Sequence, residues 1–301
     1  MEVDSITEMF LRSDEKFGVK YTNYIGDGDS KTFAGILKIN PYGDDCPVTK
    51  NECVGHVQKR MGSRLRNIKQ KRKLGGKKRL TDGVIKKLTI YYILTIRRNV
   101  DSVQKMKEAI IATLDHYCST DESPRHDNCP VGIDSWCEWR KAKSINQLKS
   151  FKHPDRLINE EVEKHIRPIY EDLSNDNLLM RCLGGYIQNS NESFNSTIWL
   201  ITPKHLNSGQ KIVEIAAYMA AGMFNEGYSA ILSVMQLLNL SIGQQCKMFA
   251  DIADTQRIER ENKRQAFSSK EARIARRLDQ MHHNEVFEEV ERLLYGPRIA
   301  D

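Results

Sequence analysis

Two acidic residues follow the first predicted strand of this 301-residue chain. The stretch "YIGDGDS" places Asp27 and Asp29 in one tight turn, directly after the strand predicted at 20–26. Carboxylates so close together repel each other unless a cation or a backbone amide lies nearby. The pattern therefore predicts either a solvated turn or a site for a divalent cation. Asp27 is the candidate ligand, and Asp29 is the alternative.

A third carboxylate lies far downstream, in "QNSNESFNSTIWLI". Phe194 and Ile198 share one face of the helix that this stretch predicts, and Glu192 projects from its first turn on another face. The helix dipole favours a carboxylate near a helix N-terminus, so a simple capping role is one interpretation. A ligand to the same cation as Asp27 is the other.

Five Cys and His residues have the types and spacing of zinc ligands: Cys53, His56, His126, Cys129 and Cys137. Four of these five would complete a tetrahedral structural site, and His116 and Cys118 are further candidates. The alternative is a small core cysteine and a set of loop residues. Residues 119–153 are predicted to be irregular, so one ion would hold this loop to the core. Trp136 and Trp139 are expected to pack beside it.

Positive charge is concentrated at 59–79, where "KRMGSRLRNIKQKRKLGGKKR" holds eleven Lys or Arg and no acid, against a net charge of +6 for the whole chain. Apolar residues recur there every three or four positions, which predicts an amphipathic helix with a cationic outer face. Such a helix is typical of nucleic-acid binding, and a basic tail or localisation signal is the alternative. The candidate phosphate contacts are Lys59, Arg60, Arg64, Arg66, Lys69, Lys71, Arg72 and Lys73.

Strands are predicted only before residue 55, and helices dominate after it. The fold class is therefore mixed α/β but predominantly helical. We divide the chain into four parts. Residues 1–56 form a helix–strand–helix–strand segment, and residues 57–186 form a helical segment with the basic helix and the Cys/His loop. Residues 187–245 form the helices that carry Glu192, and residues 246–301 form a charged helical tail.

Four stretches occur in a specific order: "YTNYIGDGDSKTF", "ECVGHVQKRMGSRLR", "HDNCPVGIDSWC" and "QNSNESFN". In this order the chain resembles the Mutator-like transposase domain, from about residue 2 to about residue 225, with weaker similarity at the C-terminal "YGPRIAD". The resemblance implies a partial, N-terminal RNase H-like core, a large all-helical insertion and a long charged C-terminal helix. It also implies DNA cutting and joining by two divalent metal ions held by three carboxylates.

Carried onto this sequence, the second acid of the family is Asp27, with Asp29 as the fallback, and the third is Glu192. Mg²⁺ or Mn²⁺ would bind there, and Zn²⁺ at the Cys/His residues would be structural. The first acid of the family lies on a strand upstream of a helix like 4–17, and every acid before Asp27 falls on that helix. We therefore expect an N-terminally truncated copy that is catalytically inactive or nearly so.

The expected partner is DNA, and self-association is left open, whereas no membrane and no small-molecule substrate are expected. No apolar run has the length of a membrane helix, and the N-terminus has no secretory signature. Seven unevenly spaced cysteines argue against a disulfide framework. We predict a nuclear or cytoplasmic protein that is not secreted. The alternative function is a non-catalytic DNA-binding or protein-interaction module derived from a transposon.

Overall fold

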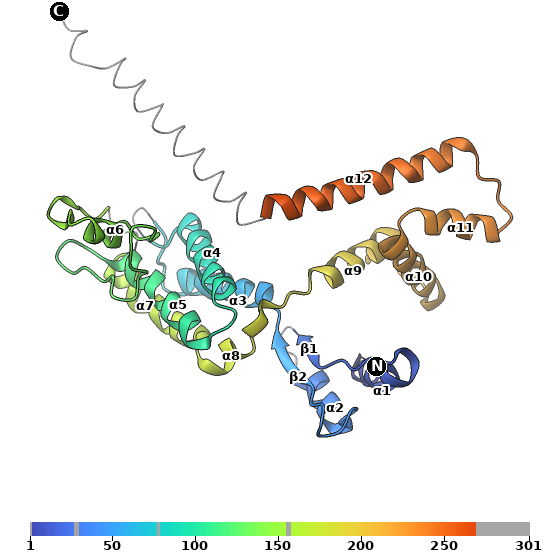
Figure 1. Ribbon diagram of the computed structural model, residues 1–301, viewed down its shortest axis with the longest axis horizontal. Coiled ribbons are helices and arrows are strands. Elements are labelled where there is room, and N and C mark those ends of the chain that lie inside the picture. The colour runs from blue at the N-terminus through green and yellow to red at the C-terminus, as the bar shows by residue number, and fades with distance from the viewer. Residues whose placement is uncertain (1, 27–29, 77–78, 155–157, 269–301) are drawn as a thin grey trace, which may run out of the picture. The chain divides into compact units, whose positions relative to one another are not determined.

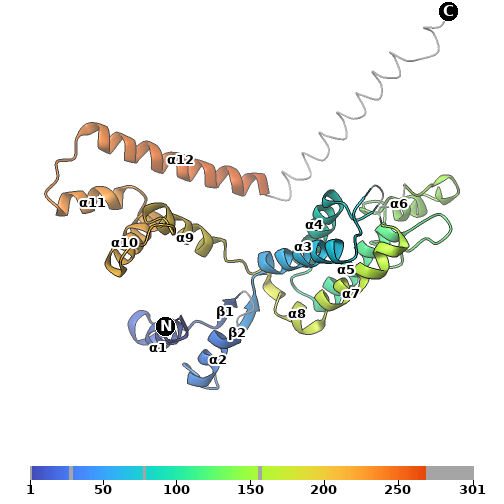
Figure 2. The ribbon, with the colours of Figure 1, turned by 180° about the vertical axis from the view of Figure 1, so that it is seen from behind.

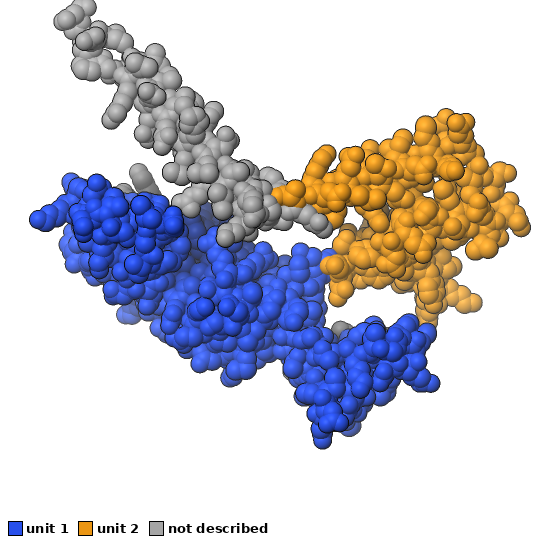
Figure 3. Space-filling view, in the orientation of Figure 1, with its two compact units in different colours: residues 1–189 blue, residues 190–301 orange. Residues whose placement is uncertain are grey.

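The computed structural model describes residues 2–26, 30–76, 79–154 and 158–268 (Figure 1). The chain forms two compact units, residues 1–189 and residues 190–301 (Figure 3). Helices predominate, and the described residues contain two short strands, so the mixed but mainly helical fold class is confirmed. Two strands do not establish an RNase H-like core. Within the described ranges, no helix combines the length and the apolar character needed to cross a bilayer.

The first unit begins with a small α/β segment. It contains α1 (Glu2–Phe17), β1 (Asn23–Gly26), α2 (Ser30–Ile39) and β2 (Thr49–Glu52). The two strands pair in parallel, with Asn23 opposite Thr49 and Gly26 opposite Glu52. A parallel pair needs a crossover connection, and α2 supplies it. Phe10, Ile36 and Val48 are buried together and form a small core between the helices and the sheet.

A helical bundle follows β2 directly (Figure 2). Its helices are α3 (Val54–Lys71), α4 (Asp82–Arg98), α5 (Val103–Cys118), α6 (Glu138–Ser144), α7 (Glu160–Leu173) and α8 (Asp176–Met180), and short 3₁₀ turns lie at Leu148–Ser150 and Leu183–Gly185. Buried side chains from α3, α4, α5, α7 and α8 form one core. On α3 the fully buried apolar residues recur every three or four positions, at Val54, Val57, Met61 and Leu65, which leaves the basic residues on the outer face.

Polar residues fix where the bundle helices begin. Thr81 accepts a hydrogen bond from the backbone N–H of Val84 at 3.3 Å, and Asn159 accepts one from that of Val162 at 2.9 Å. Each side chain satisfies a donor that the first helical turn leaves without a partner. Deeper in the core, the hydroxyl of Tyr92 donates to the carbonyl oxygen of Leu173 at 2.8 Å, which ties α4 to the end of α7.

The chain that leaves the sheet at α3 returns to it after α8. The backbone N–H of Glu52 donates to the carbonyl of Arg181 at 2.8 Å, and that of Val54 donates to the carbonyl of Tyr186 at 3.0 Å. The side-chain amide of Gln188 then donates to the carbonyl of Ile25 on β1 at 2.7 Å. The two ends of the helical excursion therefore lie together at the carboxyl ends of both strands.

The second unit contains α9 (Asn189–Ile201), α10 (Gln210–Glu226), α11 (Ser229–Leu237) and α12 (Gln244–Ser268). Gly227, between α10 and α11, has φ +82°, a conformation that favours glycine. Asp254 on α12 accepts a hydrogen bond from the backbone N–H of Tyr228 at 2.9 Å. Arg257 on the same helix donates to the carbonyl oxygen of Met223 at 2.5 Å, so α12 is fixed to the turn between α10 and α11.

Candidate metal centre and nucleic-acid interface

Four Cys and His side chains converge at the end of α5. His116 lies in the last turn of this helix, His126 and Cys129 lie in the loop that follows, and Cys137 directly precedes α6. Their ligand atoms all lie within 4.8 Å of one another. Such a group could hold a metal ion such as zinc.

The loop is shaped so that its ligands face His116. The backbone N–H of Cys129 donates to the carbonyl of His126 at 3.0 Å, which closes a tight turn between the two residues. Arg140 on α6 donates to the carbonyl of His126 at 2.9 Å and to that of Asp127 at 2.6 Å. The first turn of α6 therefore fixes the loop from the other side.

The donor atoms lie at short and similar separations. The Nδ1 atoms of His116 and His126 are 3.3 Å apart. His126 Nδ1 is 3.4 Å from the Cys137 sulfur and 3.7 Å from the Cys129 sulfur. Both cysteines are free thiols. The same nitrogen of each imidazole thus faces the same small volume as both sulfurs.

The four side chains of the group are largely shielded from solvent. His126, Cys129 and Cys137 are at most 3% exposed, and His116 is half-buried. Hydrogen bonds from Cys129, and then from His116 and His126, lower the pKa of the Cys137 thiol despite its burial. The hydrogen bond to Cys137 raises the pKa of the Cys129 thiol, so of the two thiols only Cys137 is favoured as a thiolate, the form in which cysteine binds metals.

Aromatic rings enclose the group, as predicted for the two tryptophans. The ring centroids of Trp136 and His116 are 4.9 Å apart, and those of Trp139 and His126 are also 4.9 Å apart. His153 lies on the other nitrogen of His126, with 2.9 Å between the two Nε2 atoms. A cavity of about 470 Å³ opens beside these rings, and it is lined among others by Tyr117, Phe151 and His153.

Three of the five predicted zinc ligands belong to this group, together with the further candidate His116. Cys53 and His56 lie elsewhere, where β2 passes into α3. Cys53 is buried, and its backbone N–H donates to the carbonyl of Gly26 at 3.1 Å, so it belongs to the sheet edge. Cys118 is 1% exposed in the bundle core. The alternative interpretation of Cys53 as a small core residue fits its surroundings.

The predicted acid site is described only in part. Asp27 and Asp29 lie outside the described residues. Glu192 lies in the first turn of α9 and is exposed. The acids that precede β1 in the described part of the chain all lie on α1.

A carboxylate that sequence reasoning missed lies at the end of β2. Glu52 is 2% exposed, and it pairs with Arg60 of α3 at 2.5 Å and with Arg181 of the returning segment at 3.3 Å. An acid at the end of a predicted strand was the available signal. The 129 positions between Glu52 and Arg181 concealed the partner, because no local pattern joins them.

The predicted basic helix is α3, but several of its positive charges are paired with acidic side chains. Arg60 pairs with Glu52, Arg64 pairs with Asp172, and Lys69 pairs with Asp82 at 2.8 Å. Four other candidates are exposed and form no ion pair with any acid in the described ranges: Arg66, Lys71, Arg72 and Lys73. Lys59 is exposed as well. The available positive charge is therefore greatest at the C-terminal end of α3.

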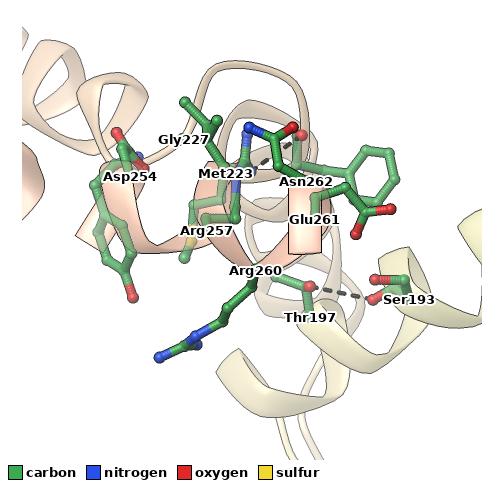
Figure 4. A pocket seen from close by; sticks show the side chains of 12 residues that line it. Ser193, Thr197, Met223, Gly227, Asp254, Arg257, Arg260, Glu261 and Asn262 are labelled. Atoms are coloured by element: carbon green, nitrogen blue, oxygen red, sulfur yellow. Dashed lines mark hydrogen bonds between the residues drawn. The ribbon is translucent and has the colours of Figure 1, made fainter. Parts of the chain in front are cut away.

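The second unit contains a cavity of about 580 Å³ between α9, the α10–α11 turn and α12 (Figure 4). Ser193 and Thr197 line it from α9, and Asp254 and Arg257 from α12. The carboxylate of Asp254 is already bound to the backbone of Tyr228, and the guanidinium of Arg257 to that of Met223. These groups connect helices of the unit.

Residues 1–137 match the family model described as Mutator-like transposase. No curated protein and no solved structure matches this chain. The match is consistent with a Mutator-like transposase-related region over residues 1–137 and confirms the resemblance for this part of the chain. The matched region contains the parallel strands, the basic helix and all four members of the Cys/His group.

Proposed function

We propose that this chain is a transposase-derived DNA-binding protein. In this proposal, α3 contacts the duplex, and Asp27 and Glu192 share a divalent cation at the carboxyl ends of the strands. The matched region and the exposed basic residues at the C-terminal end of α3 support DNA as the partner. Long cationic side chains along a helix contact phosphates and give affinity without sequence preference.

The return of the chain to the sheet after α8 is the observation that supports a shared cation site for Asp27 and Glu192. The side-chain amide of Gln188 donates to the carbonyl of Ile25. Asp27 follows Ile25 by two positions, and Glu192 follows Gln188 by four. Covalent geometry keeps the Cα atom of Glu192 within about 14 Å of that of Gln188, and Asp27 within about 7 Å of Ile25. These limits are compatible with one shared ion, although 165 positions separate the two acids in the sequence.

The donor chemistry fits Mg²⁺ or Mn²⁺, because hard carboxylate oxygens suit these ions and phosphate and water fill the other positions. When bound, such ions activate a nucleophile and stabilise charge on the leaving oxygen of a phosphodiester. The described acids before β1 lie on α1 and are not at a strand end. We therefore expect this chain by itself to bind DNA without cutting it.

A second function is favoured by apolar side chains on the second unit. Leu200, Tyr218 and Leu237 are between 78% and 84% exposed. Isolated exposed apolar residues are ordinary, but several large ones on one small unit are typical of an interaction surface. A protein-interaction module derived from a transposon, including self-association, is therefore the competing proposal.

A titration of duplex DNA at several salt concentrations tests the first proposal. With about five phosphate contacts, the log–log slope of affinity against salt should be roughly −4.5. The variant with Arg66→Ala, Lys71→Ala and Arg72→Ala should lose about three contacts, which makes the slope shallower by about 2.7.

The matched control removes the same charge elsewhere, with Lys149→Ala, Lys211→Ala and Lys247→Ala. These lysines are exposed and far from α3 in the sequence. The control should keep the native slope. A flat salt response of the native chain, or equal losses in both variants, would leave only the protein-interaction function.

A further inference from the structure

The distances within the Cys/His group match the edges of one coordination tetrahedron. A tetrahedral zinc ion with Zn–N distances of about 2.0 Å and Zn–S distances of about 2.3 Å holds two nitrogens about 3.3 Å apart, and a nitrogen and a sulfur about 3.5 Å apart. The corresponding separations are 3.3 Å between His116 and His126, and 3.4 and 3.7 Å from His126 to the two sulfurs. Each differs from the tetrahedral value by about 0.2 Å or less.

We propose that His116, His126, Cys129 and Cys137 form a structural Zn²⁺ site in which both histidines bind through Nδ1, and that His153 and Asp121 position His126. The site goes beyond DNA binding and does not depend on it. Four protein ligands complete a zinc tetrahedron and leave no position for a substrate, which is the character of a structural site.

The hydrogen bonds around His126 specify its tautomer. If Nδ1 binds the metal, the neutral ring carries its proton on Nε2, and this proton points at Nε2 of His153, 2.9 Å away. Nδ1 of His153 then donates to Asp121 Oδ1 at 2.7 Å. The backbone N–H of His153 also donates to this oxygen, at 2.8 Å. Each of the two hydrogen bonds, from His126 to His153 and from His153 to Asp121, therefore contains one proton.

Such a chain of hydrogen bonds is the usual support of a metal-binding histidine, because it fixes the ring and raises its basicity. His153 does not belong to the four ligands, and it lies 27 positions from His126. The sequence gives no sign of this role. The structure assigns it by placing the loop after α6 against the loop after α5.

The ion would hold a part of the chain that has few other means of holding its shape. Between α5 and α6 the chain has no helix or strand over residues 119–137. Metal binding supplies folding free energy to such segments. Zinc would join the end of α5 to the start of α6 and so keep Trp136 and Trp139 packed on the histidines.

Metal analysis of the purified full-length chain tests the site. One zinc per chain is expected by elemental analysis. After exchange with cobalt, the visible absorption should show the d–d bands of a tetrahedral ion and a thiolate-to-cobalt charge-transfer band. Cys137→Ser should remove the charge-transfer intensity of one thiolate, and His116→Ala should lower affinity for the metal by at least tenfold.

Cys53→Ser is the matched control, since it removes a buried thiol outside the group. It should keep the metal content and the cobalt spectrum of the native chain. A native chain that binds no zinc or cobalt, or a Cys53→Ser variant that loses the metal, would overturn the assignment. Because a ligand variant can fail to fold, chelation of the native chain is the second measurement. A strong chelator should lower its melting temperature, and an unchanged melting temperature would contradict a structural ion.

The positioning role of His153 is tested separately, by measuring the affinity of its variants for cobalt. His153→Ala should weaken cobalt affinity by about 10–100-fold in competition with a chelator, while the d–d bands stay tetrahedral. His153→Gln keeps an acceptor for the His126 proton and should recover most of the affinity. Equal affinity of the native chain and His153→Ala would remove the positioning role.

Discussion

Some functional residues can be recognised from their type and spacing in the sequence. Others can be recognised only from contacts with residues that are distant in the chain. The residue types and spacing of Cys129 and Cys137 are enough to make them candidate metal ligands. The choice of His116 over His56 could not be made from spacing, because it depends on which helix end the loop meets. His153 and Asp121 gave no usable signal, since each acts through a partner distant in the chain. Glu52 ends a predicted strand, but its partner Arg181 lies 129 positions away.

Glu163 on α7 illustrates such a residue. It is 8% exposed and pairs with Arg125 and Arg167, both at 2.6 Å. Burial opposes its ionised form, but these hydrogen bonds outweigh burial and lower the pKa of Glu163 below its ordinary value. A lowered carboxyl pKa stabilises the fold above the unfolded-state value of about 4.3, and the stabilisation is lost as pH falls through the folded value.

Glu163→Gln should therefore lower the free energy of unfolding at pH 7 by about 1–3 kcal/mol. The difference between native chain and variant should stay constant down to about pH 5 and shrink below about pH 4. Urea unfolding at several pH values measures it. Glu161→Gln, on the exposed side of the same helix, is the control and should cost about 0.5 kcal/mol or less. A difference that does not change between pH 7 and pH 3 would contradict this origin.

At the scale of elements, the helices were predictable and their connections were not. For example, α4 begins directly after Thr81, which caps its first turn, and ends before Asn99, so local residues set both of its limits. The two strands were also predicted, but their parallel pairing was not, since four residues with one buried face carry little information on register. The attachment of the basic helix to the sheet depends on ion pairs that no periodicity shows.

The element-scale prediction concerns this attachment. Glu52 joins β2, α3 and the returning segment through Arg60 and Arg181. Glu52→Gln removes the buried carboxylate charge that both guanidinium groups contact, so the free energy of unfolding should fall by about 1–3 kcal/mol.

The control is Glu138→Gln, whose partner Lys141 lies one turn away and whose side chain is 67% exposed. Its cost should be about 0.5 kcal/mol or less, because exposed ion pairs contribute little. Chemical denaturation of both variants makes the comparison. Equal losses would mean that Glu52 does not hold these elements together.

At the scale of the molecule, we propose that a long helical excursion brings distant acids to one cation. The sequence predicted the excursion because strands end before residue 55 and helices follow. Its closure was not predictable, since it rests on backbone contacts between Val54 and Tyr186 and on the amide of Gln188. The charge pattern likewise predicted a basic helix, but not that Arg60, Arg64 and Lys69 are paired.

Iron-mediated cleavage of the protein backbone tests this claim most directly. Fe²⁺ replaces Mg²⁺ at carboxylate sites and, with ascorbate and peroxide, cuts the chain beside the residues that bind it. The full-length chain should be cut at two places, near residue 27 and near residue 192, and excess Mg²⁺ should suppress both cuts. Asp27→Asn, or Asp29→Asn if that acid is the ligand, should abolish both cuts, and so should Glu192→Gln. Cleavage at one place only, or a cut near 192 that persists when both aspartates are replaced, would contradict a shared ion.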